Sequence, residues 1–87
     1  MRDEKLLNIA SATTTTVKSG SGYLNRIVIN TTAAGAITIY DNTAASGTKI
    51  ATIAASAALG TYTYQGRFSI GLTIVTAAAS DITVSYQ

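Results

Sequence analysis

Apolar residues at alternating positions are the feature that most constrains the fold of this chain. The alternation recurs in eight short runs, separated by loops of small residues, at 5–11, 13–18, 23–30, 36–41, 48–53, 61–65, 68–74 and 81–86. Alternation with a period of two predicts β-strands, and short runs at this spacing are typical of a sandwich or barrel. We therefore expect an all-β fold, a single antiparallel β-sandwich of eight short strands, with a jelly roll as one candidate topology.

Composition supports strands over helices. The chain of 87 residues contains 15 Thr and ten Ile, whose β-branched side chains favour a pleated, half-buried surface. Residues 54–60 are rich in Ala, which favours helices, but seven residues without an amphipathic pattern are too few to form one. We expect a loop or a single turn there.

Residues 23–30 form the most apolar of the eight runs. Leu24 and Val28 alternate on one face of this run, and Ile27 and Ile29 alternate on the other. A strand that is apolar on both faces is typical of a central strand with cover on both sides. We expect that position for this run.

Four further points of the pattern predict local geometry. The turn at residues 31–35 is expected to join the preceding run in a hairpin to residues 36–41. Ile50 and Ile53 are three positions apart and cannot share a face of a regular strand, which predicts a β-bulge or burial on both sides. Gly66 is expected to interrupt the strand before a buried apolar stripe of Phe68, Ile70, Leu72 and Ile74. Gly71, inside this stripe, predicts a bend or a close approach of another backbone segment.

The length of the chain fits one domain with a thin core. A chain of this size buries only about 60 to 65% of the surface that it exposes when unfolded. Because the chain has no Cys and no His, we expect association with copies of itself or with a larger assembly to supply stability. We divide the chain into an N-terminal arm or edge strand at residues 1–12 and a β-sandwich domain at residues 13–87. The charged start at residues 1–5 has no apolar segment behind it, so we expect neither a signal peptide nor a membrane span.

Residues that carry chemistry are scarce. Without Cys and His the chain lacks thiolate and imidazole metal ligands and the usual nucleophiles and general bases, so we expect no enzyme, no cofactor and no metal. Asp41 and Asp81 stand at a strand end and a strand start, where we expect them to bind backbone amides. Asp41, Asn42 and Thr43 also offer a weak start for a calcium site. Residues 19–22 (SGSG) are expected to form a turn, since no Lys-Ser or Lys-Thr pair and no helix follow.

One stretch of the sequence resembles a known type. The run GYLNRIVINT at residues 22–31 looks like a sequence type of tailed bacteriophages, and further segments with the same likeness lie at 35–42, 46–53, 71–76 and 81–84. Together they resemble small virion proteins, and among these the head decoration, or capsid cement, proteins. The likeness covers residues 17–86 and consists of strand and turn patterns.

The resemblance implies a function, a location and partners. It implies a β-sandwich or jelly-roll-like subunit, often a homotrimer, that binds the outer surface of the phage head and stabilises it. The implied partners are the major capsid protein of a phage and further copies of the chain, with assembly in the host cytoplasm. A net charge of +2 generates only a weak field, so we expect no direct contact with nucleic acid, and we expect none with a membrane.

Two other functions stay open at this point. The chain could belong to a tail, neck or fibre, or it could be a small carbohydrate- or nucleic-acid-binding module whose tyrosines stack on sugars or bases beside Lys49 or Arg67. Tyrosines of small β domains also close the edge of a core or an interface. The charged residues 2–5 fit either an arm that grips a partner or a frayed terminus. The residues that we expect to contact other subunits or the capsid are Arg2, Lys5, Leu6, Tyr40, Tyr62, Tyr64 and Arg67.

Overall fold

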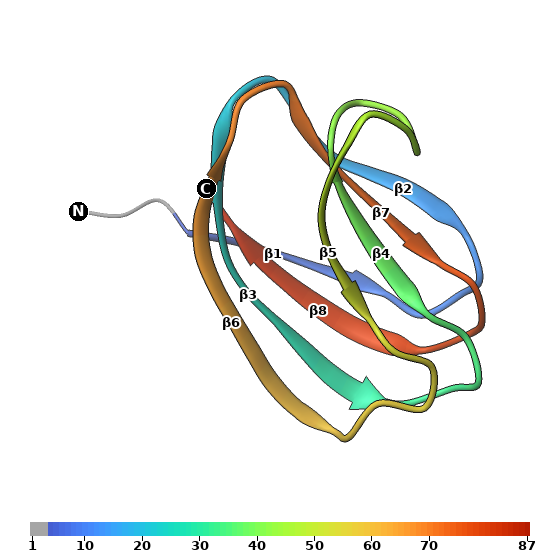
Figure 1. The fold of residues 1–87 in the computed structure, drawn as a ribbon. Helices are drawn as coiled ribbons and strands as arrows, with labels where there is room; N and C mark the ends of the chain where they lie inside the picture. The colour runs from blue at the N-terminus through green and yellow to red at the C-terminus, as the bar shows by residue number, and fades with distance from the viewer. Residues whose placement is uncertain (1–3) are drawn as a thin grey trace.

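Eight strands in two facing sheets make up the fold. The computed structural model describes residues 4–87. Figure 1 shows its strands, which are β1 (Lys5–Ile9), β2 (Thr14–Ser19), β3 (Gly22–Thr31), β4 (Ile37–Asp41), β5 (Thr48–Ile53), β6 (Gly60–Phe68), β7 (Gly71–Thr76) and β8 (Asp81–Tyr86). All pairings between them are antiparallel. The prediction of an all-β antiparallel sandwich with eight strands is confirmed.

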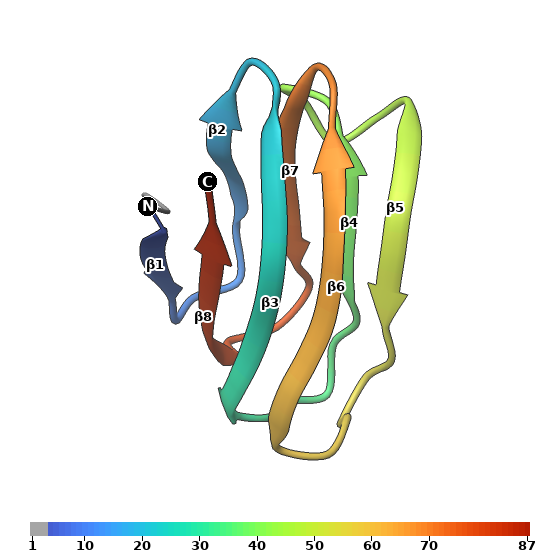
Figure 2. The ribbon, with the colours of Figure 1, turned by 90° about the vertical axis from the view of Figure 1, so that its left-hand side faces the viewer.

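The strand order within the sheets is that of a jelly roll. Sheet A has the order β1-β8-β3-β6, and sheet B has the order β2-β7-β4-β5. Strand β1 therefore neighbours β8, β2 neighbours β7, β3 neighbours β6 and β4 neighbours β5, as in a long hairpin that is wrapped into two layers. Figure 2, seen from the side of sheet A, shows its strands in front of those of sheet B.

The strand order corrects one sequence-based expectation. Strands β3 and β4 do not form a hairpin, because β3 pairs with β6 and β8 whereas β4 pairs with β5 and β7. The chain between them crosses from sheet A to sheet B (Figure 1). This crossing lets the apolar faces of both strands point into the same core.

The core lies between the two sheets and is built from the alternating residues. Strands β7 and β8 show the pattern clearly, since Leu72, Ile74, Ile82 and Val84 have no exposed surface. The other buried apolar side chains are Ile9, Leu24, Ile27, Ile29, Ile37, Ile39, Ile53 and Phe68. Every strand except β2 supplies at least one of these buried residues.

Strand β3 is central in its sheet, as expected, but the prediction of cover on both faces is wrong. A β-bulge between Leu24 and Arg26 changes the alternation and places Leu24 on the core side together with Ile27 and Ile29. Only Val28, half-buried, remains as an apolar side chain on the outer face. A regular strand would have put Leu24 on that face too.

Strand β5 contains the predicted bulge. Ile39 pairs with Ala51 and Tyr40 pairs with Lys49, so that Ile50 has no partner in β4. Ile50 is 37% exposed, whereas Ile53 is buried in the core.

The apolar stripe at residues 68–74 belongs to two strands and not to one. Phe68 ends β6, and the chain reverses before Leu72 and Ile74 enter the core from β7. Ile70 lies in the turn between them and is 56% exposed, so its expected burial is wrong. Gly66 does not interrupt the strand, because β6 continues through it. The spacing of two between apolar residues continues from Phe68 to Ile74 across the turn between β6 and β7, which is why the sequence showed one stripe.

No helix forms at residues 54–60, which agrees with the expected loop or turn. Within residues 4–87 no helix is long and apolar enough to cross a membrane.

Candidate functional site

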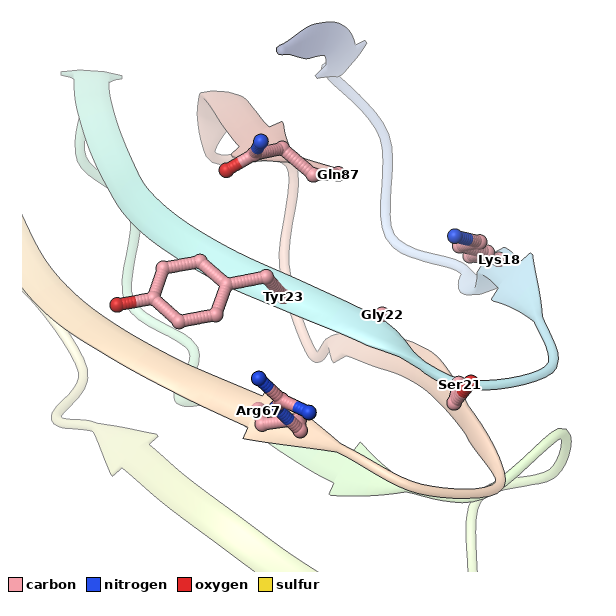
Figure 3. A pocket seen from close by; sticks show the side chains of 6 residues that line it. All are labelled: Lys18, Ser21, Gly22, Tyr23, Arg67 and Gln87. Carbon is pink, nitrogen blue, oxygen red and sulfur yellow. The ribbon is translucent and has the colours of Figure 1, made fainter. Parts of the chain in front are cut away.

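A hollow at one end of the sandwich is the candidate site. It has a volume of about 340 Å³ and is lined by Lys18, Ser21, Gly22, Tyr23, Arg67 and Gln87 (Figure 3). These residues come from β2, the turn after it, the start of β3, the end of β6 and the residue after β8. The site is thus assembled by the topology and not by one sequence motif.

The turn between β2 and β3 shapes the hollow. Gly20 has a φ of +100°, a conformation that glycine adopts without steric cost, which confirms the turn predicted at residues 19–22. The Gly20 N–H donates a hydrogen bond of 2.8 Å to the Ile70 carbonyl, so this turn is fixed to the turn between β6 and β7. A Cβ atom at Gly22 would lie 2.6 Å from Cζ of Phe68, so only glycine fits above the Phe68 ring.

Tyr23 and Arg67 face each other across neighbouring strands. They are direct partners in the register of β3 and β6, and their side chains point away from the core. Figure 3 shows the Tyr23 ring and the Arg67 guanidinium side by side, with Gly22 between them and Lys18. The Tyr23 backbone is fixed by two hydrogen bonds with Gln87, one in each direction, of 2.9 and 2.8 Å.

The charges of the hollow are positive. Neither the Lys18 nor the Arg67 side chain forms a hydrogen bond or ion pair with another residue of the range 4–87. The three acids in this range, Glu4, Asp41 and Asp81, bind groups outside the hollow. No Asp or Glu side chain of residues 4–87 lines the hollow, which holds two cations and, beside Lys18, the Gln87 main-chain oxygen.

Glu4 and Asp81 bind groups on sheet A. Glu4 forms an ion pair of 2.9 Å with Arg26. Asp81 accepts a hydrogen bond of 2.6 Å from the Asn8 side-chain amide. Glu4 thus connects the residue before β1 to β3, and Asp81 connects the start of β8 to β1.

Asp41 binds the turn between β6 and β7. Its carboxylate accepts hydrogen bonds from the backbone N–H groups of Ser69 at 3.0 Å, Ile70 at 2.9 Å and Gly71 at 3.4 Å. The bonds from Ile70 and Ser69 lower the pKa of the Asp41 carboxyl below its ordinary value of 3.8. The expectation that Asp41 binds backbone amides is confirmed, although these amides are distant in sequence. The bonds also occupy the carboxylate that a calcium site at residues 41–43 would need.

Asp41→Asn is expected to lower the free energy of unfolding by about 1–2 kcal/mol at neutral pH, because a surface carboxylate with three amide donors is replaced by a neutral amide. The folded-state pKa of Asp41 is lowered, so its contribution is complete above the unfolded value near 3.8 and is lost as pH falls through the folded-state pKa. Urea unfolding of both proteins across this acid range measures the effect. The stability difference should disappear in acid, and a difference that stays constant down to low pH would contradict this role.

Tyr62 and Tyr64, predicted as contact residues, lie on the inner side of β6. Both are half-buried and pack against the core cluster. The Tyr62 hydroxyl donates a hydrogen bond of 2.7 Å to the Ala58 carbonyl. Burial, and secondly the neighbouring Tyr62, raise the pKa of the Tyr64 hydroxyl. This packing favours the reading in which tyrosines close the edge of a core over the reading in which they stack on a ligand.

The other predicted contact residues are spread over the molecule. Leu6 is 69% exposed on β1, next to exposed Lys5, and Tyr40 is half-buried on the outer face of sheet B. Of the predicted residues that the structure describes, only Arg67 lines the hollow. Arg2 lies outside the described residues.

Comparisons with known proteins identify no relative of this chain. No family model matches the chain, and neither the curated proteins nor the solved structures give a match. Within residues 4–87 no group of three or more acidic, His or Cys side chains is placed to hold a metal ion.

Proposed function

We propose that this protein is a structural virion subunit without enzymatic activity, a decoration or cement protein that binds the outside of a phage head and stabilises it. The jelly-roll strand order is the observation that supports this most. Jelly rolls recur in viral capsid proteins, although they also occur in lectins and cupins. The segments that carry the resemblance to phage decoration proteins coincide with β3, β4, β5, β7 and β8, so the likeness extends over both sheets.

The outer face of sheet B is the surface that we assign to the capsid. One row of this face, near the ends of the strands, runs across all four of them as Thr14, Val75, Thr38 and Thr52, which are neighbours in the register. The row contains no charge, and the central parts of protein interfaces are depleted of charged residues. The outer face of sheet A, by contrast, carries the ion pair between Arg26 and Glu4.

Strand β6 supports the association of copies. It is an edge strand of nine residues, and residues 60–66 of it contain no charge and no proline. Natural proteins usually protect such an edge with charge, proline or a partner. We propose that further copies cover it in a homotrimer, whose mass in sedimentation equilibrium would be three times that of the chain.

Binding to heads tests the proposed function. The purified protein should sediment with expanded heads that lack it and should raise the temperature at which these heads release their DNA. Tails purified from the same phage are the second target, because a tail, neck or fibre component would sediment with them. Protein that stays in solution with both would contradict a role in the virion.

Thr38→Glu tests which face binds the head. A carboxylate in the middle of the uncharged row should abolish sedimentation with heads, because a charge without a partner is costly to bury in an interface. Thr63→Glu is the matched control, since Thr63 is exposed on sheet A and pairs with Arg26. Equal retention of both variants would overturn the assignment of this face.

A further inference from the structure

Two cations, Lys18 and Arg67, line the same hollow. The proposed function does not explain why both are there. Lys18 belongs to β2 in sheet B, and Arg67 belongs to β6 in sheet A. The fold thus brings together two charges that are far apart in the sequence and belong to different sheets. Like charges in one hollow repel each other, and an anion between them would relieve this repulsion.

The position of Lys18 is set by the bare backbone of Gly22. The Lys18 ammonium nitrogen lies 3.0 Å from the place that a Cβ atom at Gly22 would occupy. The ammonium therefore lies over the backbone at the start of β3, the strand that also carries Tyr23. Lys18 is half-buried and lines the hollow.

The remaining polar groups of the hollow suit an acceptor-rich ligand. Ser21 contributes a hydroxyl group, which can donate a hydrogen bond, whereas the Tyr23 hydroxyl points away from Ser21 and Lys18 (Figure 3). The Gln87 backbone carbonyl already accepts the Tyr23 N–H. Arg67 presents a planar guanidinium, whose paired N–H groups match the two oxygens of a carboxylate or phosphate.

We propose that this hollow is a binding site for an oxyanion, a carboxylate or a phosphate group, held between Lys18 and Arg67 with the Ser21 hydroxyl as a further donor. A volume of about 340 Å³ gives ample room for one such group and lies at the lower end of the range of ligand pockets. The anion has two sources, an acidic side chain of a partner protein or free phosphate. The inference does not depend on the proposed function, because it follows from the charges and donors of the hollow alone.

Titration followed by NMR tests the site and distinguishes the two sources. The probes are inorganic phosphate and a short peptide with one central Glu and otherwise neutral residues. Binding should shift the backbone amide signals of Ser21 and Gly22 and the side-chain signal of Arg67 in a saturable way. Saturation by phosphate alone would assign a phosphate site, and saturation by the peptide would assign a site for a protein carboxylate.

Charge-neutral variants make the test specific. Lys18→Gln and Arg67→Gln should each weaken binding about tenfold or more, because each removes one of the two charges. Lys49→Gln is the matched control, since Lys49 is exposed on β5 and does not line the hollow. Thermal unfolding of all three variants checks that they remain folded. Shifts that do not saturate, or equal affinities of the three variants, would overturn the proposal.

Discussion

Phe68→Ala is expected to lower the free energy of unfolding by about 3–5 kcal/mol, the range measured for the loss of buried aromatic side chains. Phe68 is fully buried and is the only Phe of the chain. It ends β6, and its ring fills the space below Gly22, under the hollow. The sheets cannot collapse fully over the empty space, because the backbone is fixed on both sides of Phe68. Before it, Arg67 pairs with Tyr23 of β3, and after it, the turn to β7 is hydrogen-bonded to Gly20.

The loss expected for Phe68→Ala is a large part of the total free energy of unfolding. Small proteins are stabilised by about 0.05–0.15 kcal/mol per residue, which for a chain of this length is about 4–13 kcal/mol. Urea unfolding of the variant, followed by circular dichroism, measures the loss. Phe68→Leu is the control, with an expected loss of about 1–2 kcal/mol because most of the volume is kept. An Ala variant as stable as the Leu variant would contradict the packing described for this end of the sandwich.

Gly71→Ala is the second substitution with a large expected effect, a loss of about 2–3 kcal/mol from overpacking. A Cβ atom at Gly71 would lie 2.8 Å from the Lys18 carbonyl oxygen and 3.0 Å from the Asn42 carbonyl oxygen. Both neighbours are backbone atoms, so relief requires a movement of β2 or of the segment after β4. The same movement would lengthen the hydrogen bond of 3.4 Å from the Gly71 N–H to Asp41.

Gly66→Ala is the matched control for this substitution. Gly66 also lies in a strand, but a Cβ atom there would have no heavy atom within 4 Å. The substitution should leave stability unchanged or raise it slightly, because Ala restricts the unfolded chain more than Gly does. Urea unfolding of the two variants side by side measures the difference. If both lost stability equally, the close approach at Gly71 would not be the cause.

The sequence was sufficient to predict the strands because burial on one face leaves a period of two. The bulge at Ile50 and the close approach at Gly71 were predictable for the same reason, since both are exceptions to a regular pattern. Strand neighbours were not predictable in this way. The pattern shows which side chains point inward, but it does not show which strand lies beside which, and the expected hairpin between β3 and β4 failed for that reason. The prediction of one buried stripe at residues 68–74 was wrong because Ile70, which lies in a turn, keeps the spacing of two between apolar residues.

The hollow could be predicted only in part. Arg67 was expected to contact a partner, and the turn at residues 19–22 was expected from its Ser and Gly residues. Lys18 was not connected with them, because the jelly-roll strand order brings β2, β3 and β6 together at this end. Tyr23 was one of five tyrosines in the sequence, and only its register opposite Arg67 distinguishes it from Tyr62, which packs on the core.

The location of the chain in the virion tests the central claim most directly. Electron cryomicroscopy of heads with and without the bound protein would show where it lies. The proposed function predicts additional density on the outer surface of the head, at positions where capsid subunits meet, with the outer face of sheet B toward the shell. Density confined to the tail, neck or fibres, or no additional density on heads at saturating protein, would contradict the account.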